Sequence, residues 1–261
     1  MIPWRTLDRA TTSDGSELAI ARRDRQFAIR VDGQVLMDSE SHGSEEKLAE
    51  HGCAGLRGAP RARVLVGGLG MGFTARAALD QLGADARVDV AELVGAVVRW
   101  NRDLIGHLAG APLLDRRLRV VEGDVADTIA GSRRRYDAIL LDVDNGPEAL
   151  TSFKNKRLYT RAGLEGARRA LRPNGVLALW SAFDARPFTA RLGESGFDVT
   201  VRRVRAHGGS THRHVLWLAR VRPTPTAAPR PRLTAPSTSA DEEGAAVPQR
   251  RAPAWPTHKT T

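Results

Sequence analysis

The sequence contains one cysteine, Cys53, in 261 residues, which excludes an intrachain disulfide and argues against a metal site built from cysteines. No run approaches the roughly 18 apolar residues that a membrane helix needs. The segment 1–12 mixes acidic and basic side chains and lacks the apolar stretch of a signal peptide. We therefore expect a soluble cytoplasmic protein that does not associate with membranes and binds no metal.

The chain also lacks the motifs of several catalytic classes. It contains no G-x-x-x-x-G-K-[ST] loop for a nucleoside triphosphate and no N-P-P-Y segment of the kind used to modify base or amide nitrogens. No Ser/His/Asp triad can be assigned by spacing. His212 and His214 flank Arg213 with no third metal ligand in view, so we expect them on a strand surface.

The formal net charge is +10, a balance that can indicate a nucleic-acid or other anionic partner. Residues 222–261 supply six Lys or Arg against three acids, which accounts for +3 of this charge. The other arginines are spread along the chain, often on expected helix faces, as at Arg116, Arg117, Arg168 and Arg169. A dedicated nucleic-acid surface is therefore disfavoured.

Composition divides the chain into three segments. Residues 222–261 hold eight of the fourteen prolines and few large apolar residues, so we expect a disordered Pro/Arg-rich tail that cannot offset its ordering entropy by burial. Short apolar runs at 16–23, 26–31 and 34–37 predict a small β-meander, with Asp32-Gly33 as a hairpin signal. The expected segments are 1–50 (meander and acidic stretch), 51–221 (main domain) and 222–261 (tail).

The main domain alternates strands with helices. Apolar strand runs separated by helical stretches indicate a parallel sheet covered on both faces; the expected strands are 62–67, 87–92, 118–123, 136–142, 175–181, 198–204 and 214–221, and the expected helices include 74–81, 93–102 and 162–171. The last two strands are joined by a loop too short for a helical crossover and should pair antiparallel. This predicts an α/β fold: a Rossmann-like, seven-stranded, mostly parallel sheet of the class I methyltransferase type.

The segment "VLVGGLGMGF" places three glycines, Gly68, Gly70 and Gly72, between a strand and a helix. Glycine permits positive φ and lets the backbone approach a ligand closely. The dinucleotide fingerprint G-x-G-x-x-G is not met, because Phe73 occupies the place of its third glycine. The loop therefore favours a nucleotide-like cofactor without a pyrophosphate.

Two acids follow the next two strands. Glu92 can accept hydrogen bonds from both ribose hydroxyls, although a solvated acid at a helix start is the simpler interpretation. Asp124 can accept from an adenine amino group while the Val125 N–H donates to the ring, and Asp124 can equally be an N-cap. Because the carboxyl ends of parallel strands converge on one crevice, we expect an adenosyl cofactor there.

The fourth main-domain strand ends in "LLDVDNGP", which places Asp142 at the cofactor crevice. A carboxylate there can hold, orient or deprotonate an incoming amine. The alternative interpretation is a loop acid that caps the following turn.

At this point the span from about Ser16 to Arg220 resembles a spermidine synthase, also called a polyamine aminopropyltransferase. The resemblance runs through "DGQVLM", the acidic "DSESHGSEEKLAEH", the glycine loop, "VVEGDVADTI", "YDAILLDVDNGP" and "LY". That family transfers the aminopropyl group of decarboxylated S-adenosylmethionine to putrescine. It is often dimeric or tetrameric, which leaves a homodimer open for this chain.

The resemblance also implies roles for individual residues. Asp142 would be the catalytic base; Gly68, Gly70, Gly72, Glu92, Asp124 and Val125 would bind the cofactor; and Glu45, Asp144, Asn145 and Tyr159 would contact a small amine substrate.

Four positions depart from the family pattern. Met71 and Asn145 stand where the family has acids, Ser44 replaces a tyrosine and Val35 a glutamine. These changes keep two alternatives open: a methyltransferase that uses S-adenosylmethionine on a small molecule, with RNA less favoured, and a family member without catalysis. An aminopropyltransferase-like enzyme remains the first hypothesis.

Overall fold

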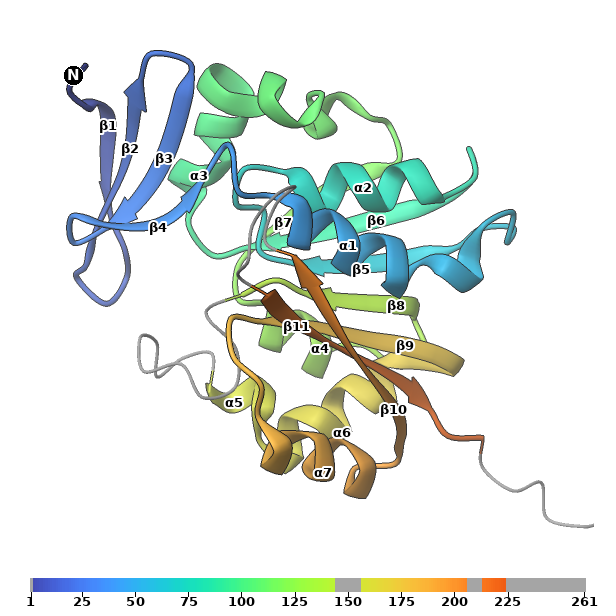
Figure 1. Ribbon diagram of the computed structural model, residues 1–261. Helices are drawn as coiled ribbons and strands as arrows, with labels where there is room; N and C mark the ends of the chain where they lie inside the picture. Colours follow the sequence, from blue (N-terminus) through green and yellow to red (C-terminus); the bar gives the residue numbers. More distant parts are fainter. Residues whose placement is uncertain (1, 144–155, 206–212, 224–261) are drawn as a thin grey trace, which may run out of the picture. The chain divides into compact units, whose positions relative to one another are not determined.

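The computed structural model describes residues 2–143, 156–205 and 213–223. The N-terminal strands form an antiparallel sheet in the order β1-β2-β3-β4 (Figure 1), with the bounds Arg5–Thr11, Glu17–Arg23, Gln26–Val31 and Gln34–Asp38. Asp32 and Gly33 have φ values of 48° and 80° and join β3 to β4 through a two-residue turn, as predicted. The meander is therefore confirmed, with one strand more than expected.

The additional strand, β1, is a sheet edge that the sequence pattern does not reveal. Apart from Leu7, its residues RTLDRAT are charged or small, and most are exposed, so they give no apolar run. β1 pairs antiparallel with β2. The Trp100 indole N–H donates to Asp8 at 2.7 Å and lowers the pKa of that carboxyl, so β1 is anchored to the main domain.

The main domain has a seven-stranded sheet in the order β10-β11-β9-β8-β5-β6-β7. β5 to β9 are parallel to one another, whereas β11 is antiparallel to both β9 and β10. This confirms the predicted fold class; the strand bounds are β5 Arg63–Gly67, β6 Arg87–Glu92, β7 Leu118–Glu122, β8 Tyr136–Leu141, β9 Leu171–Ser181, β10 Phe197–Arg205 and β11 Arg213–Val221.

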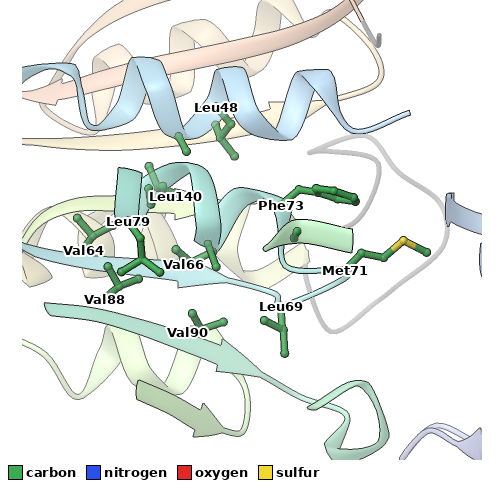
Figure 2. Packing of buried hydrophobic residues seen from close by; sticks show 14 of the residues in the cluster. Leu48, Val64, Val66, Leu69, Met71, Phe73, Leu79, Val88, Val90 and Leu140 are labelled. Carbon is green, nitrogen blue, oxygen red and sulfur yellow. The ribbon is translucent and has the colours of Figure 1, made fainter. Parts of the chain in front are cut away.

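Successive residues of the central strands face opposite layers of the core. Val64 and Val66 on β5 pack with helices α1, α2 and α3 (Figure 2), while Leu65 between them packs with α4, α6 and α7. Figure 1 shows these helices on the two faces of the sheet. The helix bounds are α1 Gly43–Gly52, α2 Phe73–Gln81, α3 Gly95–Trp100, α4 Val125–Ala130, α5 Lys156–Tyr159, α6 Arg161–Ala170 and α7 Arg186–Glu194.

The predicted helix 93–102 is only partly correct. The α-helix ends at Trp100 and continues as a π turn, Asn101–Ile105, and a 3₁₀ turn, Gly106–Ala109. The Asn101 amide donates to the carbonyl oxygens of Val97 and Gly70, so the irregular turn is tied to the glycine loop.

The described residues belong to one compact unit of the chain, Met1–Thr224. The division into 1–50, 51–221 and 222–261 stays a prediction, and the tail from residue 224 onward lies outside the described residues. None of the described helices has the length and apolar character required to cross a membrane.

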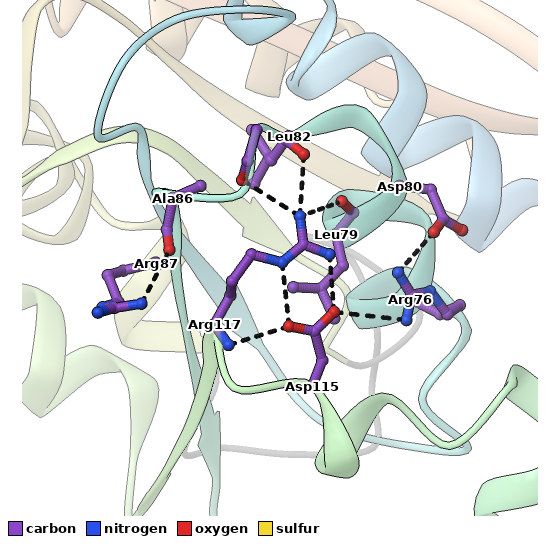
Figure 3. A network of polar contacts seen from close by, with 9 residues as sticks. Arg76, Leu79, Asp80, Leu82, Ala86, Arg87, Asp115 and Arg117 are labelled. Atoms are coloured by element: carbon purple, nitrogen blue, oxygen red, sulfur yellow. Dashed lines mark hydrogen bonds and ion pairs between the residues drawn. The ribbon is translucent and has the colours of Figure 1, made fainter.

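Arg117 stabilises the end of α2 through a polar network (Figure 3). Its guanidinium donates to the carbonyl oxygens of Leu79, Leu82 and Gly83 at 2.9–3.2 Å and to Asp115 at 2.7 and 3.0 Å. These bonds satisfy carbonyls that the end of a helix leaves without partners. The hydrogen bonds from Arg117 lower the pKa of Asp115 from its usual 3.8 to about 2.

We expect Arg117→Ala to lower the free energy of unfolding by about 2–4 kcal/mol, because it removes these bonds and leaves Asp115 with only its longer ion pair to Arg76, at 3.7 Å. Urea unfolding measures the loss, and the exposed neighbour Arg116→Ala is the control. Because folding depresses the pKa of Asp115, its contribution is present above about pH 4 and is lost as the pH falls toward 2. Equal losses in the two variants would contradict this role of Arg117.

Candidate functional site

A cavity of about 500 Å³ lies where the carboxyl ends of the parallel strands meet the N-terminal sheet. The loops after β5, β6, β7 and β8 form its floor, β2, β3 and β4 cover it, and α1, β9 and β11 close one end. The residues predicted from the sequence that line it are Gly68, Gly70, Glu92, Asp124, Val125, Asp142 and Glu45. The structure therefore brings together seven side chains or loop positions that the sequence placed at one crevice.

The glycine loop has the backbone expected of it. Gly68, Gly70 and Gly72 have φ values of 82°, 51° and 92°. A Cβ on Gly68 would lie 3.0 Å from the Asp142 carbonyl oxygen, and one on Gly70 would lie 3.1 Å from Met37 Sδ. Gly72 does not line the cavity; it begins α2, where a Cβ would lie 2.9 Å from Pro112. Two glycines thus face the cavity and the third permits close packing behind it.

Glu92 holds the floor of the cavity together. Its carboxylate accepts from the backbone N–H of Leu69 and from that of Val94, both at 2.8 Å. The side chain is buried, and burial raises its pKa, while the backbone N–H groups act in the opposite direction. Glu92 therefore lines the cavity and also accepts hydrogen bonds that hold the loops after β5 and β6 in place.

Asp124 is an N-cap, as one interpretation of the sequence expected, and it also lines the cavity. It accepts from the Ala126 N–H at 2.7 Å and begins α4. Its other oxygen pairs with Arg157 at 2.6 Å. Val125 is buried and lines the same wall. Both roles proposed for Asp124 are therefore compatible with its placement.

Asp142 follows β8 and points a carboxylate at the opposite end of the cavity. It accepts a hydrogen bond from the Thr74 hydroxyl at 2.6 Å. Burial raises the pKa of Asp142, and the Thr74 hydrogen bond opposes that shift because it stabilises the ionised form. A carboxyl group with a raised pKa in a cavity is suited to exchange protons near neutral pH.

Glu45 on α1 supplies a second carboxyl group at this end. Its Oε2 is buried and has no hydrogen-bond partner. Burial raises the pKa of Glu45, and the charges of Asp142 and then Asp38 raise it further. Two neighbouring carboxyl groups that repel each other hold on to a proton more strongly than either would alone. A cation placed between them would remove that repulsion.

The same end contains His214, which the sequence did not assign to it, beside Ser44 and Trp180. Ser44 Oγ and His214 Nδ1 lie 2.9 Å apart, and the ring of His214 meets the ring of Trp180 edge to face at 4.6 Å. His214 therefore lines the cavity instead of the strand surface that we expected. The signal was hidden because Ser44 and His214 are 170 residues apart. The Trp180 indole nitrogen is buried without a hydrogen-bond partner.

Charge is distributed unevenly around the cavity. Its described lining contains five carboxyl groups, Asp38, Glu45, Glu92, Asp124 and Asp142, and no lysine or arginine. This acidic cavity lies in a chain with a net charge of +10. Such a lining favours a cationic ligand and disfavours one with an unpaired carboxylate. Within the described residues, no group of three or more His, Cys, Asp or Glu is arranged to hold a metal ion.

The remaining sequence candidates fall in different places. Met71 is buried in the core and does not line the cavity, whereas Val35 and Ser44 do. Tyr159 is buried behind the site, where its hydroxyl donates to the Val143 carbonyl oxygen at 3.0 Å; it is not part of the described cavity lining. Asp144 and Asn145 lie outside the described residues.

Comparison with known proteins identifies relatives of the chain. No family model matches the sequence. A polyamine aminopropyltransferase of Nitrosomonas europaea is 32% identical over 176 residues, which cover 66% of this chain and 51% of that protein. Polyamine aminopropyltransferase 2 of Streptomyces coelicolor is 33% identical over 172 residues, 62% of this chain and 29% of the relative. The chain thus spans about half the length of the first relative and less than a third of the second.

Solved structures support the fold. A spermidine synthase from Thermotoga maritima matches with a TM-score of 0.66, and a spermidine synthase in complex with the transition-state analogue AdoDATO matches with 0.65. Each match has 16% identity and covers 83% of this chain and 72% of the other. The likeness confirms the methyltransferase-like fold, and together with the sequence matches it confirms the predicted family resemblance.

We expect Gly72→Ala to lower the free energy of unfolding by about 1–3 kcal/mol, because a Cβ there combines positive φ with contact to Pro112. Gly193→Ala is the matched control, since Gly193 lies in α7 with negative φ and has open space around its Cβ position. Denaturant titration of both variants measures the difference. A loss in Gly193→Ala as large as in Gly72→Ala would show that the loop conformation is not the cause.

Proposed function

From the chain's kinship with the polyamine aminopropyltransferases, we propose that it transfers an aminopropyl group from decarboxylated S-adenosylmethionine to a small amine such as putrescine. The observation that carries the proposal is the cavity lining, with five carboxyl groups and no lysine or arginine among its described residues. Both reactants are cations, so they fit a site of this charge.

The floor of the cavity fits the adenosyl part of the donor. Gly68 and Gly70 leave the loop backbone uncovered, Val125 offers an apolar surface, and Glu92 and Asp124 offer carboxylates at the ends of β6 and β7. These residues would hold the donor, which when bound would supply an activated carbon beside its sulfonium. The chain contributes alignment, because holding two reactants in register removes much of the entropic barrier.

At the other end, Asp142 and Glu45 would hold the acceptor amine. An ammonium group has no lone pair for attack, so it must first lose a proton. Asp142 is suited to accept that proton, since burial raises its pKa and Thr74 fixes one of its oxygens. Glu45, with an oxygen that lacks a partner, would bind the cation beside it.

This arrangement compensates for one departure from the family pattern, at Met71. Met71 stands where the resembling family has an acid, and its side chain is buried away from the cavity. Asp38 and Glu45 bring carboxyl groups to the amine end from β4 and α1 instead. The absence of an acid at position 71 therefore does not deprive the cavity of carboxyl groups.

Methyl transfer from intact S-adenosylmethionine is the second candidate. The intact cofactor carries a carboxylate that would need a donor or a cationic partner. The described lining offers no lysine or arginine for it and places further carboxyl groups nearby. The acidic lining therefore favours the decarboxylated form.

Calorimetry with decarboxylated S-adenosylmethionine, S-adenosylmethionine and methylthioadenosine tests this proposal. We expect the decarboxylated form to bind about tenfold or more tightly than the intact form, because an unpaired buried carboxylate is unfavourable by more than about 1.4 kcal/mol. Tighter binding of the intact form would contradict aminopropyl transfer. A folded protein that binds none of the three would contradict both enzyme hypotheses.

The hydroxyl of Thr74 gives a pH-dependent test of Asp142. Thr74 donates to the ionised carboxylate, so Thr74→Val should raise the pKa of Asp142 and move the acidic limb of kcat/KM upward by about 1 pH unit. Turnover at high pH should change little. Thr200→Val, at an exposed position on β10, is the control and should leave the profile unchanged.

In the same assay, Asp142→Asn should lower kcat by about a hundredfold or more, the range typical for loss of a general base. Unchanged turnover in Asp142→Asn would remove this residue from the mechanism. A profile that does not move in Thr74→Val would show that another group sets the acidic limb.

A further inference from the structure

A second hollow, of about 350 Å³, lies at the other edge of the seven-stranded sheet. It is lined by the residues before β8, the last turn of α6, the start of β9 and the residues after β11. Because β8 and β9 are parallel and β11 is antiparallel to β9, the first residues of β8 and β9 lie beside the last residues of β11 at one edge of the sheet. The carboxyl ends of β5 to β8, which form the acidic cavity, lie at the opposite edge.

Arginine dominates this hollow, which we call the arginine groove. Six of its eleven lining residues are arginines: Arg133, Arg134, Arg168, Arg169, Arg172 and Arg222. Arg172 pairs with Asp137 at 2.7 Å, and Arg222 pairs with Asp198 at 3.0 Å. Within the described part of the chain, the other four have no carboxylate within ion-pair distance. Arginines that looked scattered in the sequence are thus gathered around one hollow.

Contacts between distant segments fix the backbone that carries the groove's arginines. The Arg134 N–H donates to the Arg169 carbonyl oxygen at 2.8 Å, which joins the segment before β8 to the end of α6. The Arg168 side chain packs over Gly196, where a Cβ would lie 3.2 Å from its Cδ. The Arg222 N–H donates to the Gly196 carbonyl oxygen at 3.1 Å. The groove is therefore held by contacts between segments distant in sequence.

Helix stabilisation accounts for only some of the arginines in the groove. Arg168 and Arg169 lie in the last turn of α6, where the helix dipole favours positive charge. Arg133 and Arg134 lie outside any helix, and no carboxylate in the described part of the chain is within ion-pair distance of them, so neither explanation accounts for these two. Four unpaired guanidinium groups around one hollow create a local positive potential that attracts an anion.

The lining also limits the kind of anion. A guanidinium group offers a planar fork of donors that matches phosphate oxygens. The other lining residues, Leu171, Pro173, Asn174, Val221 and Pro223, include no aromatic ring on which a nucleobase could stack. We propose that the arginine groove binds a compact polyphosphate anion, recognised through its phosphates alone.

Equilibrium dialysis of the full chain with inorganic tripolyphosphate at about 0.15 M salt tests the proposal. We expect saturable binding of one anion per chain, and ATP within about threefold of tripolyphosphate because the base is not recognised. Arg168→Gln with Arg169→Gln should weaken both by about tenfold or more. The matched control, Arg116→Gln with Arg119→Gln, removes the same charge from exposed positions at and before β7 and should change affinity less than twofold.

Three results would overturn the proposal. Equal weakening in the control variant would indicate general charge attraction, and tighter binding of a short single-stranded RNA than of tripolyphosphate would indicate an extended ligand. The third is an absence of saturable binding by the folded wild-type chain. Aminopropyl transfer is measured separately, so failure of the groove leaves the proposed activity untouched.

Discussion

The carboxylate of Glu92 is the contact on which the cavity depends. It accepts from Leu69 in the glycine loop and from Val94 in the turn before α3, and so fixes two loops that follow neighbouring strands. The loop in turn carries Gly68 against the carbonyl of Asp142, while Asn101 holds the Gly70 carbonyl from the far side. Burying a carboxylate is unfavourable unless hydrogen bonds replace its water, so these N–H groups and Glu92 stabilise each other's positions. Removing either partner would release the floor on which a ligand rests.

Charge separation is the second constraint. The chain is strongly basic, yet its described cavity lining is acidic, and six of its arginines gather at the other edge of the sheet. Exposed charges are screened over about 8–10 Å in physiological salt, so a ligand in the cavity responds to the carboxyl groups beside it more than to the net charge. A cationic reactant and an anionic ligand can therefore bind the same molecule at separate places. The opposite signs would disfavour an anion in the cavity and a cation in the arginine groove.

The sequence was sufficient wherever a residue's role depends on its neighbours along the chain. Periodic apolar runs predicted the strands, and the places after them predicted Glu92, Asp124 and Asp142 at one edge. It failed where the partner is distant. Ser44 and His214 meet across 170 residues, and Asn101 reaches Gly70 from a turn that local propensity describes as a plain helix. Met71 is a different case, because the motif alignment placed it at the ligand site but its side chain is buried in the core. The backbone conformation of the loop decides which side chains face the cavity.

The cover of the cavity has an evolutionary consequence. Val35, Leu36 and Met37 lie on β4, the outer strand of the N-terminal sheet, and Val35 and Leu36 are 53% and 45% exposed. Val35 and Leu36 add little to the core, so substitutions of these two residues should change the free energy of unfolding little, whereas Met37 packs against the core. The floor at Glu92 and Gly68, in contrast, is tied into the packing of the main sheet. Under the proposed function, substitutions in the cover could change which acceptor amine enters the cavity, one residue at a time, while the floor stays unchanged.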